Sequence, residues 1–165
     1  MLLGIDLGGT KIEGIVLKSK ENPDEIIRHR INTEEEKGYS QVINNIKSLV
    51  NHIENKINYK FKRLGIGTPG TIDPETGLLK NSNSQCLNGM PIQKDLAKTL
   101  DKIIHIQNDA NCFALAETLL GSVKDQYPDA KNVFGIIIGT GVGGGVIIDG
   151  KTVYGSQGIG GEWGH

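Results

Sequence analysis

The chain carries two copies of a glycine-rich segment, and these copies restrict its possible folds more than any other feature. The first copy, residues 4–17, reads GIDLGGTKIEGIVL, and the second, residues 135–148, reads GIIIGTGVGGGVII. They lie 131 residues apart, counted from Gly4 to Gly135. In each copy, glycines interrupt alternating apolar residues, which is typical of two strands joined by a tight turn. Two such hairpins indicate two halves of similar design.

The turn of the first copy suits an anionic ligand. Gly8 and Gly9 lack β-carbons, so backbone N–H groups can approach an oxyanion directly, and Thr10 and Lys11 add a hydroxyl and a cation. The segment does not have the spacing of a Walker A loop, which runs into a helix. An ordinary Gly-Gly turn is the alternative, but the existence of a second copy favours phosphate binding.

The second copy satisfies G-x-G-x-x-G at Gly139, Gly141 and Gly144. A dinucleotide-binding fold needs a helix after these glycines, so that the helix N-terminus meets the pyrophosphate. Here residues 146–148 are apolar and lead into Asp149-Gly150, a typical hairpin turn. We therefore expect a second phosphate-binding hairpin, and a nucleotide held between two lobes.

Composition excludes several classes of protein. Hydrophobic residues make up 37%, charged residues 22%, and the formal net charge is -1, which is typical of a globular protein and gives no electrostatic case for nucleic acid or anionic lipid. No apolar run approaches the roughly 20 residues of a membrane span, and the N-terminus lacks the pattern of a signal peptide. Cys86 and Cys112 are too far apart for a C-x-x-C site. We expect a cytoplasmic protein that binds neither nucleic acid nor membrane.

Between the hairpins, the pattern predicts an α/β arrangement. Apolar residues from Tyr39 onward recur at steps of three and four, which predicts a long amphipathic helix. The long polar loop 70–89 is expected to be functional. The other predicted elements are strands at residues 26–31, 64–67 and 103–106, a helix at 92–100, a largely buried helix at 110–120, and a boundary turn at 127–131.

Several polar residues are candidates for ligand contacts. Asn81, Asn83 and Asn88 could bond a polyhydroxylated ligand or simply form turns. Asn108 and Asp109 follow a predicted strand and precede a helix, where open α/β sheets bind ligands. Asp109 suits a helix N-cap, a general base, or both. Near the C-terminus, Glu162 and His165 stand among glycines, as ligand contacts or as solvated loop residues.

Taken together, the motifs resemble the ROK family (repressors, open reading frames and sugar kinases). This resemblance implies the two-lobed actin and hexokinase-like ATPase fold, which is ribonuclease H-like. We expect a first lobe with a mixed sheet over residues 1–125 and the start of a second, incomplete lobe over 126–165. The motifs are DLGGTK (6–11), GIGTPG (65–70), NSN (81–83), NDAN (108–111), GTGVGGG (139–145) and GEWGH (161–165).

The resemblance also implies roles for individual residues. Asp109 is similar to the catalytic base of the family, and Asp6 to the acid near the metal and the γ-phosphate. The residues similar to sugar ligands are Asn83, Asn108, Glu162 and His165. The residues similar to the phosphate hairpins are Gly8, Gly9, Thr10, Lys11, Gly139, Thr140 and Gly141.

The implied reaction is phosphorylation of the primary hydroxyl of a hexose by ATP with Mg²⁺. LLKNSNS, LNG and GEWGH look most like bacterial fructokinases, which implies fructose 6-phosphate as the product. Alternatives are an N-acetylglucosamine or N-acetylmannosamine kinase, or a sugar-binding regulator without catalysis. A regulator is less favoured, because Met1 leads directly into the first strand and leaves no room for a helix-turn-helix.

The C-terminal end departs from the family pattern. Family members continue from the histidine into a cysteine cluster that completes a structural zinc site, whereas this sequence stops at His165. We therefore expect a fragment that is inactive alone and, since tetrahedral zinc needs about four ligands, has no tight zinc site. The apolar second hairpin is expected to be exposed and to drive self-association into a homo-oligomer.

Overall fold

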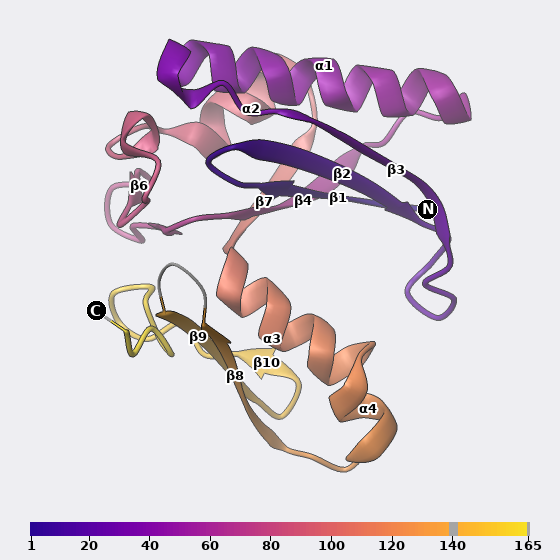
Figure 1. Cartoon of the computed structure of the whole chain (residues 1–165), viewed down its shortest axis with the longest axis vertical. Helices are drawn as coiled ribbons and strands as arrows, with labels where there is room; N and C mark the ends of the chain where they lie inside the picture. The colour runs from indigo at the N-terminus through magenta and orange to yellow at the C-terminus, as the bar shows by residue number, and fades with distance from the viewer. Residues whose placement is uncertain (139–141, 165) are drawn as a thin grey trace. The chain divides into compact units, whose positions relative to one another are not determined.

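The computed structural model describes residues 1–138 and 142–164 (Figure 1). Contacts within the chain divide it into two compact units, Met1–Gln107 and Asn108–His165. Both units combine a sheet with helices, and the first sheet is mixed, which confirms the expected α/β class. The division at residue 125 differs from these units, because the contacts group the helix after residue 108 with the second unit. The division into a first lobe over residues 1–125 and a second lobe over 126–165 stays a proposal.

The first unit is built on a five-stranded sheet with the order β3-β2-β1-β4-β7. β1 pairs antiparallel with β2, β2 antiparallel with β3, and β1 parallel with β4. The turn at residues 8–10 therefore closes a hairpin, as expected. The elements are β1 (Leu2–Leu7), β2 (Lys11–Leu17), β3 (Glu25–Asn32), α1 (Tyr39–Ile57), β4 (Arg63–Thr68), β5 (Thr71–Ile72), β6 (Leu79–Lys80), α2 (Ile92–Leu100) and β7 (Ile103–Asn108), with short 3-10 turns at Glu35–Lys37 and Gln85–Leu87.

The long helix predicted from Tyr39 is α1, and it supplies much of the core of this unit. α1 and α2 lie on the same face of the sheet (Figure 1). Apolar side chains at steps of three and four along α1 are buried, as an amphipathic helix on a sheet requires. The buried apolar residues of α1 are Val42, Ile43, Ile46, Leu49, Val50 and Ile53.

A buried charge cluster ties the last turn of α1 to the following loop and to the segment before β7. Glu54 is only 2% exposed. Its Oε1 accepts from the Phe61 N–H and from Lys102 Nζ, each at 2.8 Å, and its Oε2 accepts from Lys60 Nζ at 2.9 Å. Lys102 Nζ also donates to the Phe61 carbonyl at 2.7 Å. Every charge in this cluster has a partner, which a buried carboxylate requires.

The second unit contains a three-stranded antiparallel sheet with the order β10-β9-β8. β9 follows the glycines as a strand, so the sequence argument against a dinucleotide-binding helix is confirmed. Asp149 and Gly150 both have positive φ, 48° and 72°, as the turn between β9 and β10 requires. The elements are α3 (Asp109–Leu119), α4 (Ser122–Gln126), β8 (Asn132–Ile138), β9 (Val142–Ile148) and β10 (Lys151–Thr152).

The two glycine hairpins share their topology but not their register. In the first hairpin Gly14 pairs with Ile5. The corresponding residue of the second hairpin, Gly145, pairs with Gly135, which corresponds to Gly4. The pairing is therefore shifted by one residue, so the internal repeat describes the strand order and not every cross-strand pair.

α3 covers one face of the second hairpin, and the C-terminal loop covers part of the other face, where a β-carbon at Gly144 would come within 2.6 Å of the Gly161 carbonyl. Its buried residues are Ala110, Asn111 and Ala114, and a β-carbon at Gly135 of β8 would come within 2.7 Å of Ala114 Cβ. The expectation that this helix is largely buried was wrong, because Phe113, Leu119 and Leu120 are exposed. The small Ala114 and Gly135 provide the close contact instead.

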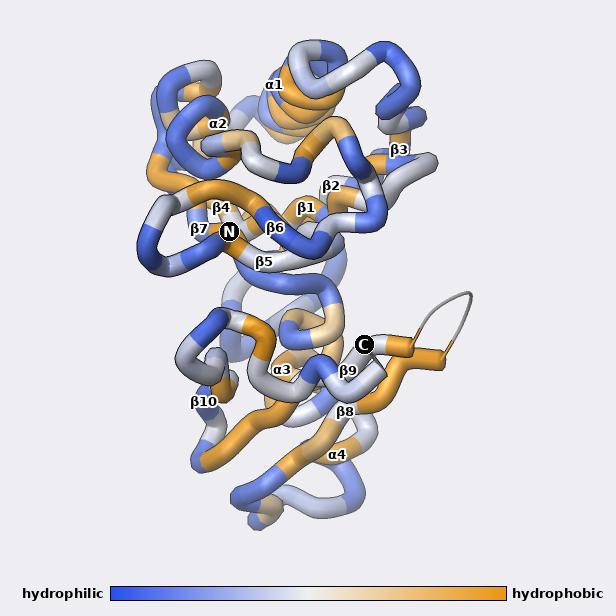
Figure 2. Tube along the Cα trace, turned by 90° about the vertical axis from the view of Figure 1, so that its left-hand side faces the viewer, coloured by the Kyte–Doolittle hydropathy of each residue, from blue (hydrophilic) through white to orange (hydrophobic). Residues whose placement is uncertain are grey.

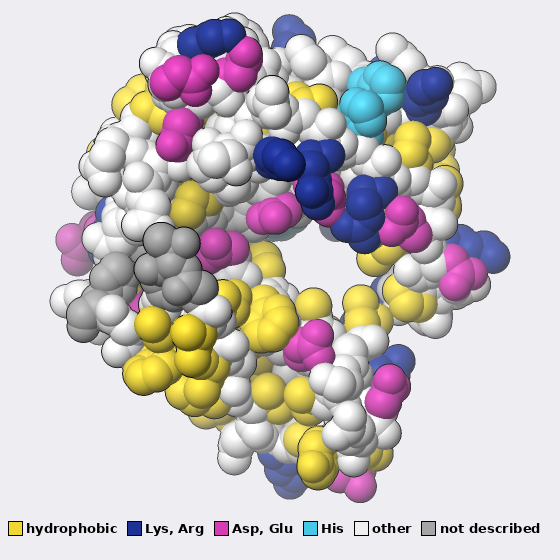
Figure 3. Space-filling view, in the orientation of Figure 1, with side chains coloured by type: hydrophobic (Ala, Val, Ile, Leu, Met, Phe, Trp, Pro, Cys, Tyr) yellow, Lys and Arg dark blue, Asp and Glu magenta, His cyan; other side chains and the backbone are white. Residues whose placement is uncertain are grey.

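On the face of β8 opposite α3, Phe134, Ile136 and Ile138 alternate along the strand, with exposed fractions of 49%, 46% and 75%. The Phe134 ring meets the Trp163 ring edge to face, so the exposed apolar surface is mainly that of Ile136 and Ile138. Figure 2 shows hydrophobic residues running up to both ends of the grey segment, and Figure 3 shows hydrophobic side chains gathered beside the grey residues. An apolar strand face at the edge of a sheet is an association hazard.

We expect the chain to self-associate through this face of β8. Replacing both Ile136 and Ile138 by lysine should lower the apparent mass in light scattering toward that of the monomer. Ile26→Lys is the matched control, because Ile26 is 44% exposed on β3 and lies outside this surface. A wild-type chain that is monomeric at high concentration would contradict the prediction.

None of the helices in the described part of the chain is long and apolar enough to cross a bilayer.

Candidate active site

The first expected phosphate turn, residues 8–10, is held in shape by Thr33, which lies just after β3. The Thr33 hydroxyl donates to the Gly8 carbonyl at 2.6 Å, and the Thr33 N–H donates to the Thr10 carbonyl at 3.0 Å. The Gly8 N–H donates to the Lys11 carbonyl at 3.0 Å. The N–H groups of Gly9 and Thr10 donate to no other described residue. The Gly8 and Thr10 carbonyls are therefore bonded to Thr33, and two N–H donors remain for an oxyanion. Such a turn fits a phosphate group.

Lys11 and Asp6 lie on the two strands that flank this turn. Lys11 begins β2 and Asp6 is the penultimate residue of β1, and both are exposed. An exposed ammonium beside free N–H donors suits the phosphates of a nucleotide, and an exposed carboxylate suits Mg²⁺, which prefers oxygen ligands. These residues therefore fit the nucleotide and the metal that the resemblance implies.

Three residues that the sequence argument missed lie in the same unit near this turn. A β-carbon at Gly9 would be 3.3 Å from Ser84 Oγ and 3.4 Å from each Glu35 carboxylate oxygen. The glycine thus lets the turn contact both the polar loop and the segment after β3. Glu35 Oε2, like Thr68 Oγ1 at the end of β4, is buried without a hydrogen-bond partner among the described residues. Only the position of Ser84 inside the polar loop could have indicated this contact.

The structure separates the three asparagines of the polar loop by role. Asn88 is a structural residue, because its side chain accepts from the Ser82 N–H and donates to the Ser82 carbonyl, both at 2.9 Å. Asn81 adopts a left-handed conformation with φ of 57°, typical of a turn asparagine. Asn83 is exposed and its side chain has no hydrogen bond to another described residue. Asn81 is exposed too and its side chain likewise has no hydrogen bond to another described residue, so Asn81 and Asn83 are both available to a ligand, whereas Asn88 is not.

In the second unit, the structure shows which of Asn108 and Asp109 caps the helix that follows them. Asn108 is the N-cap of α3, and its Oδ1 accepts from the Asn111 N–H at 3.1 Å. The cap role therefore belongs to Asn108, which is buried, and Asp109 is the first residue of the helix. The Asp109 side chain is exposed and its Oδ1 accepts only locally, from the Ala110 N–H at 2.8 Å. Its carboxylate can therefore serve as a base.

The environment of Asp109 makes its carboxyl a stronger base than an ordinary aspartate. Desolvation raises the pKa of Asp109 above its ordinary value, although the N–H groups of Ala110 and of Asp109 itself lower it in part. The side chain is solvent-accessible and yet surrounded by enough protein to be desolvated. A general base is most efficient when its pKa approaches the working pH.

The glycines of β9 bring the start of α3 and the C-terminal loop together. A β-carbon at Gly145 would come within 2.8 Å of the Ala110 carbonyl, and one at Gly144 within 2.6 Å of the Gly161 carbonyl. A β-carbon at Gly143 would lie 3.5 Å from Ala110 Cβ and 3.7 Å from Glu162 Oε2. Glu162 and Asp109 therefore belong to one local cluster in the second unit. These glycines serve close packing, which the motif alone did not indicate.

The family of the chain follows from a comparison with known proteins. The model of the ROK family matches residues 2–165. The chain belongs to the ROK family. The resemblance inferred from the motifs is therefore confirmed, and the actin and hexokinase-like fold is confirmed by solved ROK structures.

Curated and solved ROK proteins resemble the chain over its whole length. N-acetyl-D-glucosamine kinase of Aliivibrio salmonicida is 39% identical over 165 residues, which are 100% of this chain and 52% of that protein. The ROK hexokinase of Thermus thermophilus superposes with a TM-score of 0.83 at 30% identity, over 99% of this chain and 52% of that one. A ROK glucokinase of Streptomyces griseus, solved with glucose and AMPPNP, gives 0.80 at 25% identity, over 99% and 49%. The chain spans about half the length of the curated relatives it matches.

Four of the residues that the ROK resemblance singles out lie outside the described residues. They are Gly139, Thr140 and Gly141 of the second phosphate hairpin and His165, the expected sugar and zinc ligand. Among the residues that the structure describes, no cluster of three or more His, Cys, Asp or Glu side chains could hold a metal ion. The roles of these four residues stay predictions.

The close packing of β9 on α3 leads to a prediction for the ROK glycine motif. Gly145→Ala should place a methyl group against the Ala110 carbonyl and Asn111 Cα, at 2.8 and 2.9 Å. Because both are helix backbone, α3 must shift, and we expect a loss of about 1–3 kcal/mol in the free energy of unfolding, as in overpacked cores. Urea unfolding measures this loss.

Gly65→Ala is the control for this prediction, since a β-carbon there meets nothing within 4 Å. Equal unfolding midpoints for the two variants would show that Gly145 has no packing role.

Proposed function

We propose that a protein of the relatives' length that contains these 165 residues phosphorylates the primary hydroxyl of N-acetyl-D-glucosamine with ATP. The observation that carries this proposal is the position of Asp109, an exposed carboxylate of raised pKa at the start of α3, directly after the N-cap Asn108. A capped helix start holds the carboxylate in one place while it stays accessible. Sugar phosphorylation needs such a fixed base at the attacking hydroxyl.

Asp109 accepts the proton of the sugar hydroxyl as that oxygen attacks the γ-phosphorus of ATP, and the bond from phosphorus to the bridging oxygen breaks, releasing ADP. Asn108, Glu162, Asn83 and His165 are proposed to bind the sugar hydroxyls. These residues orient the sugar so that a single hydroxyl reaches the base, and orientation of this kind contributes strongly to rate.

In the first unit, the Gly9 and Thr10 N–H groups and the Lys11 ammonium are proposed to bind the phosphates of ATP. These N–H groups and the ammonium would stabilise the negative charge that develops on the phosphates in the transition state. Electrostatic stabilisation of this kind is often the largest contribution to catalysis. Asp6 would hold Mg²⁺, which supplies charge neutralisation of the phosphates when it is bound. Gly139, Thr140 and Gly141 are proposed as the second phosphate hairpin.

The relatives favour an N-acetylated sugar over fructose. The sequence argument ranked fructokinase first, but curated relatives that match the whole chain are named N-acetyl-D-glucosamine kinase. The solved relatives are named as a hexokinase and a glucokinase. Fructose therefore becomes the less favoured substrate, and N-acetylmannosamine and glucose are the competitors that matter. A cytoplasmic location and a homo-oligomeric state belong to the same proposal.

A phosphorylation screen tests the proposal. ADP release from ATP is measured with N-acetyl-D-glucosamine, N-acetylmannosamine, glucose, mannose and fructose. We expect the highest kcat/KM with N-acetyl-D-glucosamine. A highest kcat/KM with fructose would restore the first ranking. Sugar binding without ADP release from any sugar, together with a sugar-sensitive shift of duplex DNA, would overturn the kinase in favour of a regulator.

A further inference from the structure

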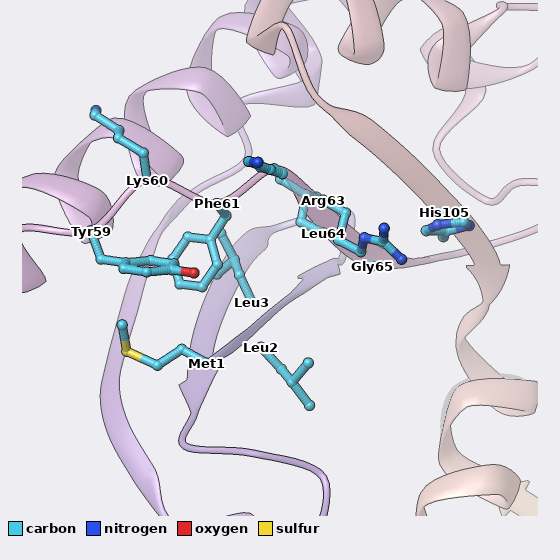
Figure 4. Close-up of a pocket in the computed structure, with 11 residues that line it drawn as sticks. Met1, Leu2, Leu3, Tyr59, Lys60, Phe61, Arg63, Leu64, Gly65 and His105 are labelled. Carbon is cyan, nitrogen blue, oxygen red and sulfur yellow. The ribbon is translucent and has the colours of Figure 1, made fainter.

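A hollow of about 500 Å³ opens in the first unit, at the end of the sheet where β1 and β4 begin (Figure 4). This volume is within the range of roughly 300–1,000 Å³ that small-molecule sites occupy. The hollow lies far along both strands from the proposed phosphate turn, which follows the other end of β1. It therefore belongs to no part of the proposed active site. The hollow is lined by Met1, Leu2, Leu3, Tyr59, Lys60, Phe61, Lys62, Arg63, Leu64, Gly65 and His105.

One side of the hollow is apolar and aromatic. Leu3, Phe61 and Leu64 form a buried floor, with exposed fractions of 5% or less. The Tyr59 ring meets the Phe61 ring edge to face, with centroids 5.0 Å apart, and Tyr59 remains 44% exposed. Figure 4 shows the Tyr59 and Phe61 rings side by side, with the Met1 side chain next to them. Such a surface suits a flat ring, which gains both apolar burial and aromatic contact.

The other side of the hollow is cationic and lacks compensating acids. Arg63 extends toward His105 in Figure 4, and no Asp or Glu is among the lining residues. Lys60 is engaged by Glu54 at 2.9 Å, but neither Lys62 nor Arg63 forms an ion pair with any described residue. A guanidinium has a fork of donors that matches the planar oxygens of a carboxylate or a phosphate.

Another hollow of this unit, lined by residues of α1 and α2, offers no such combination. Its tyrosine is already bonded, because the Tyr39 hydroxyl donates to Asp95 at 2.8 Å. Asp95 also places a negative charge beside Lys47 and Lys98, so that this hollow is mixed in charge. Aromatic surface and uncompensated cations come together in the hollow at Tyr59 and Arg63.

We propose that the hollow at Tyr59 and Arg63 is a second binding site, for small organic anions that carry an aromatic ring. The ring lies on Phe61 and Tyr59, and the oxyanion meets Arg63 and Lys62. An aromatic carboxylate and an aryl or nucleoside phosphate share this chemistry, and the test distinguishes them.

The test uses the 15N-labelled chain and four probes: 1-naphthyl phosphate, 1-naphthoate, neutral 1-naphthol and inorganic phosphate. We expect saturable shifts of the amide signals of Tyr59, Arg63 and His105 with at least one anionic naphthyl probe. Naphthol and inorganic phosphate should bind about tenfold or more weakly, because each has only half of the recognised chemistry. Tighter binding of the phosphate assigns phosphate esters, and tighter binding of naphthoate assigns carboxylates.

Two substitutions in the hollow and one control substitution distinguish a specific site from non-specific binding. Arg63→Gln and Tyr59→Ser should each weaken the better naphthyl anion about tenfold, a loss typical of one charge-assisted or stacking contact. Both side chains are exposed, so the fold should persist. Lys47→Gln removes an exposed lysine of α1 and should leave the affinity unchanged. The proposal is overturned by equal binding of naphthol, by unchanged affinity in Arg63→Gln, or by shifts confined to other residues.

Discussion

Asp109→Asn is expected to lower kcat by about 100-fold to 10,000-fold in a protein of the relatives' length, the usual range for loss of a general base. The amide cannot accept the hydroxyl proton, but it is nearly isosteric and can keep the local bond from the Ala110 N–H. KM for the sugar should therefore change little. ADP release measured at saturating sugar gives the ratio of kcat values directly.

The pH profile provides a second readout for Asp109. Because the pKa of Asp109 is raised, its base form is lost as the pH falls through a value above the ordinary 3.8. The wild-type kcat/KM should therefore fall on acidification, beginning at a higher pH than an ordinary aspartate would give. This fall should be absent in Asp109→Asn. Asp125→Asn, an exposed aspartate of α4, is the matched control. Near-normal turnover in Asp109→Asn would exclude it as the base.

Glu54→Gln is expected to cause the largest loss of stability in the first unit. The substitution removes the negative charge beside Lys102, whose side chain is only 10% exposed, and leaves that ammonium buried without a counter-ion. Breaking a buried ion pair on one side costs about 3–5 kcal/mol. Since Lys60 is 68% exposed and can turn to water, we expect the lower end of that range. Urea unfolding of the two proteins measures the difference.

The same contact should be visible in the pH dependence of unfolding. Burial raises the pKa of Glu54, but Lys102, Lys60 and the Phe61 N–H outweigh it, so that the pKa lies below the ordinary 4.5. Its stabilisation is therefore present above the unfolded-state pKa and is lost as the pH falls through the lowered folded-state pKa. The difference in the free energy of unfolding between wild type and Glu54→Gln should become smaller as the pH is lowered. An equal difference in unfolding free energy at neutral and at strongly acidic pH would contradict this prediction. Glu36→Gln is the control, because Glu36 is exposed in the turn before α1, and it should unfold with the same free energy as wild type.

Periodicity and turn chemistry predicted most of the first unit. The apolar spacing from Tyr39 predicted α1, and Pro91 marked the start of α2, which spans Ile92–Leu100 as expected. Both kinds of pattern are local, and local patterns can be recognised without tertiary information. The glycine hairpins were also recognisable, because strand alternation on both sides of a glycine turn is local too.

The errors came from contacts that are distant in sequence. The helix predicted at 110–120 looked buried from its apolar residues, but its buried residues are Ala110, Asn111 and Ala114, and Phe113 touches β8 while staying exposed. The register of the second hairpin differs by one residue from the first, although the sequences align without a gap. The phosphate-binding role was assigned to residues 139–141, and no role was predicted for Gly144 and Gly145 of β9, which permit close packing.

For the candidate site, the sequence predicted the positions of the candidate residues on strands, turns and helices better than it predicted their hydrogen-bond partners. Asn108 and Asp109 lie between β7 and α3 as expected, but only the structure shows that Asn108 is the cap. Asn88 and Asn83 are indistinguishable by composition, and they differ in whether the side chain is already bonded. Thr33, which fixes the phosphate turn from after β3, had no sequence signal.

The central claim is that these residues belong to a kinase that transfers the γ-phosphate of ATP to the 6-hydroxyl of N-acetyl-D-glucosamine. Proton–phosphorus correlation NMR of the reaction product tests it most directly. We expect one sugar-phosphate signal, besides the phosphorus signals of ADP, that correlates with the two H6 protons of the sugar and grows in step with ADP. A phosphorus signal that correlates with H1 or another ring proton, or ADP formation that does not depend on the sugar, would contradict it.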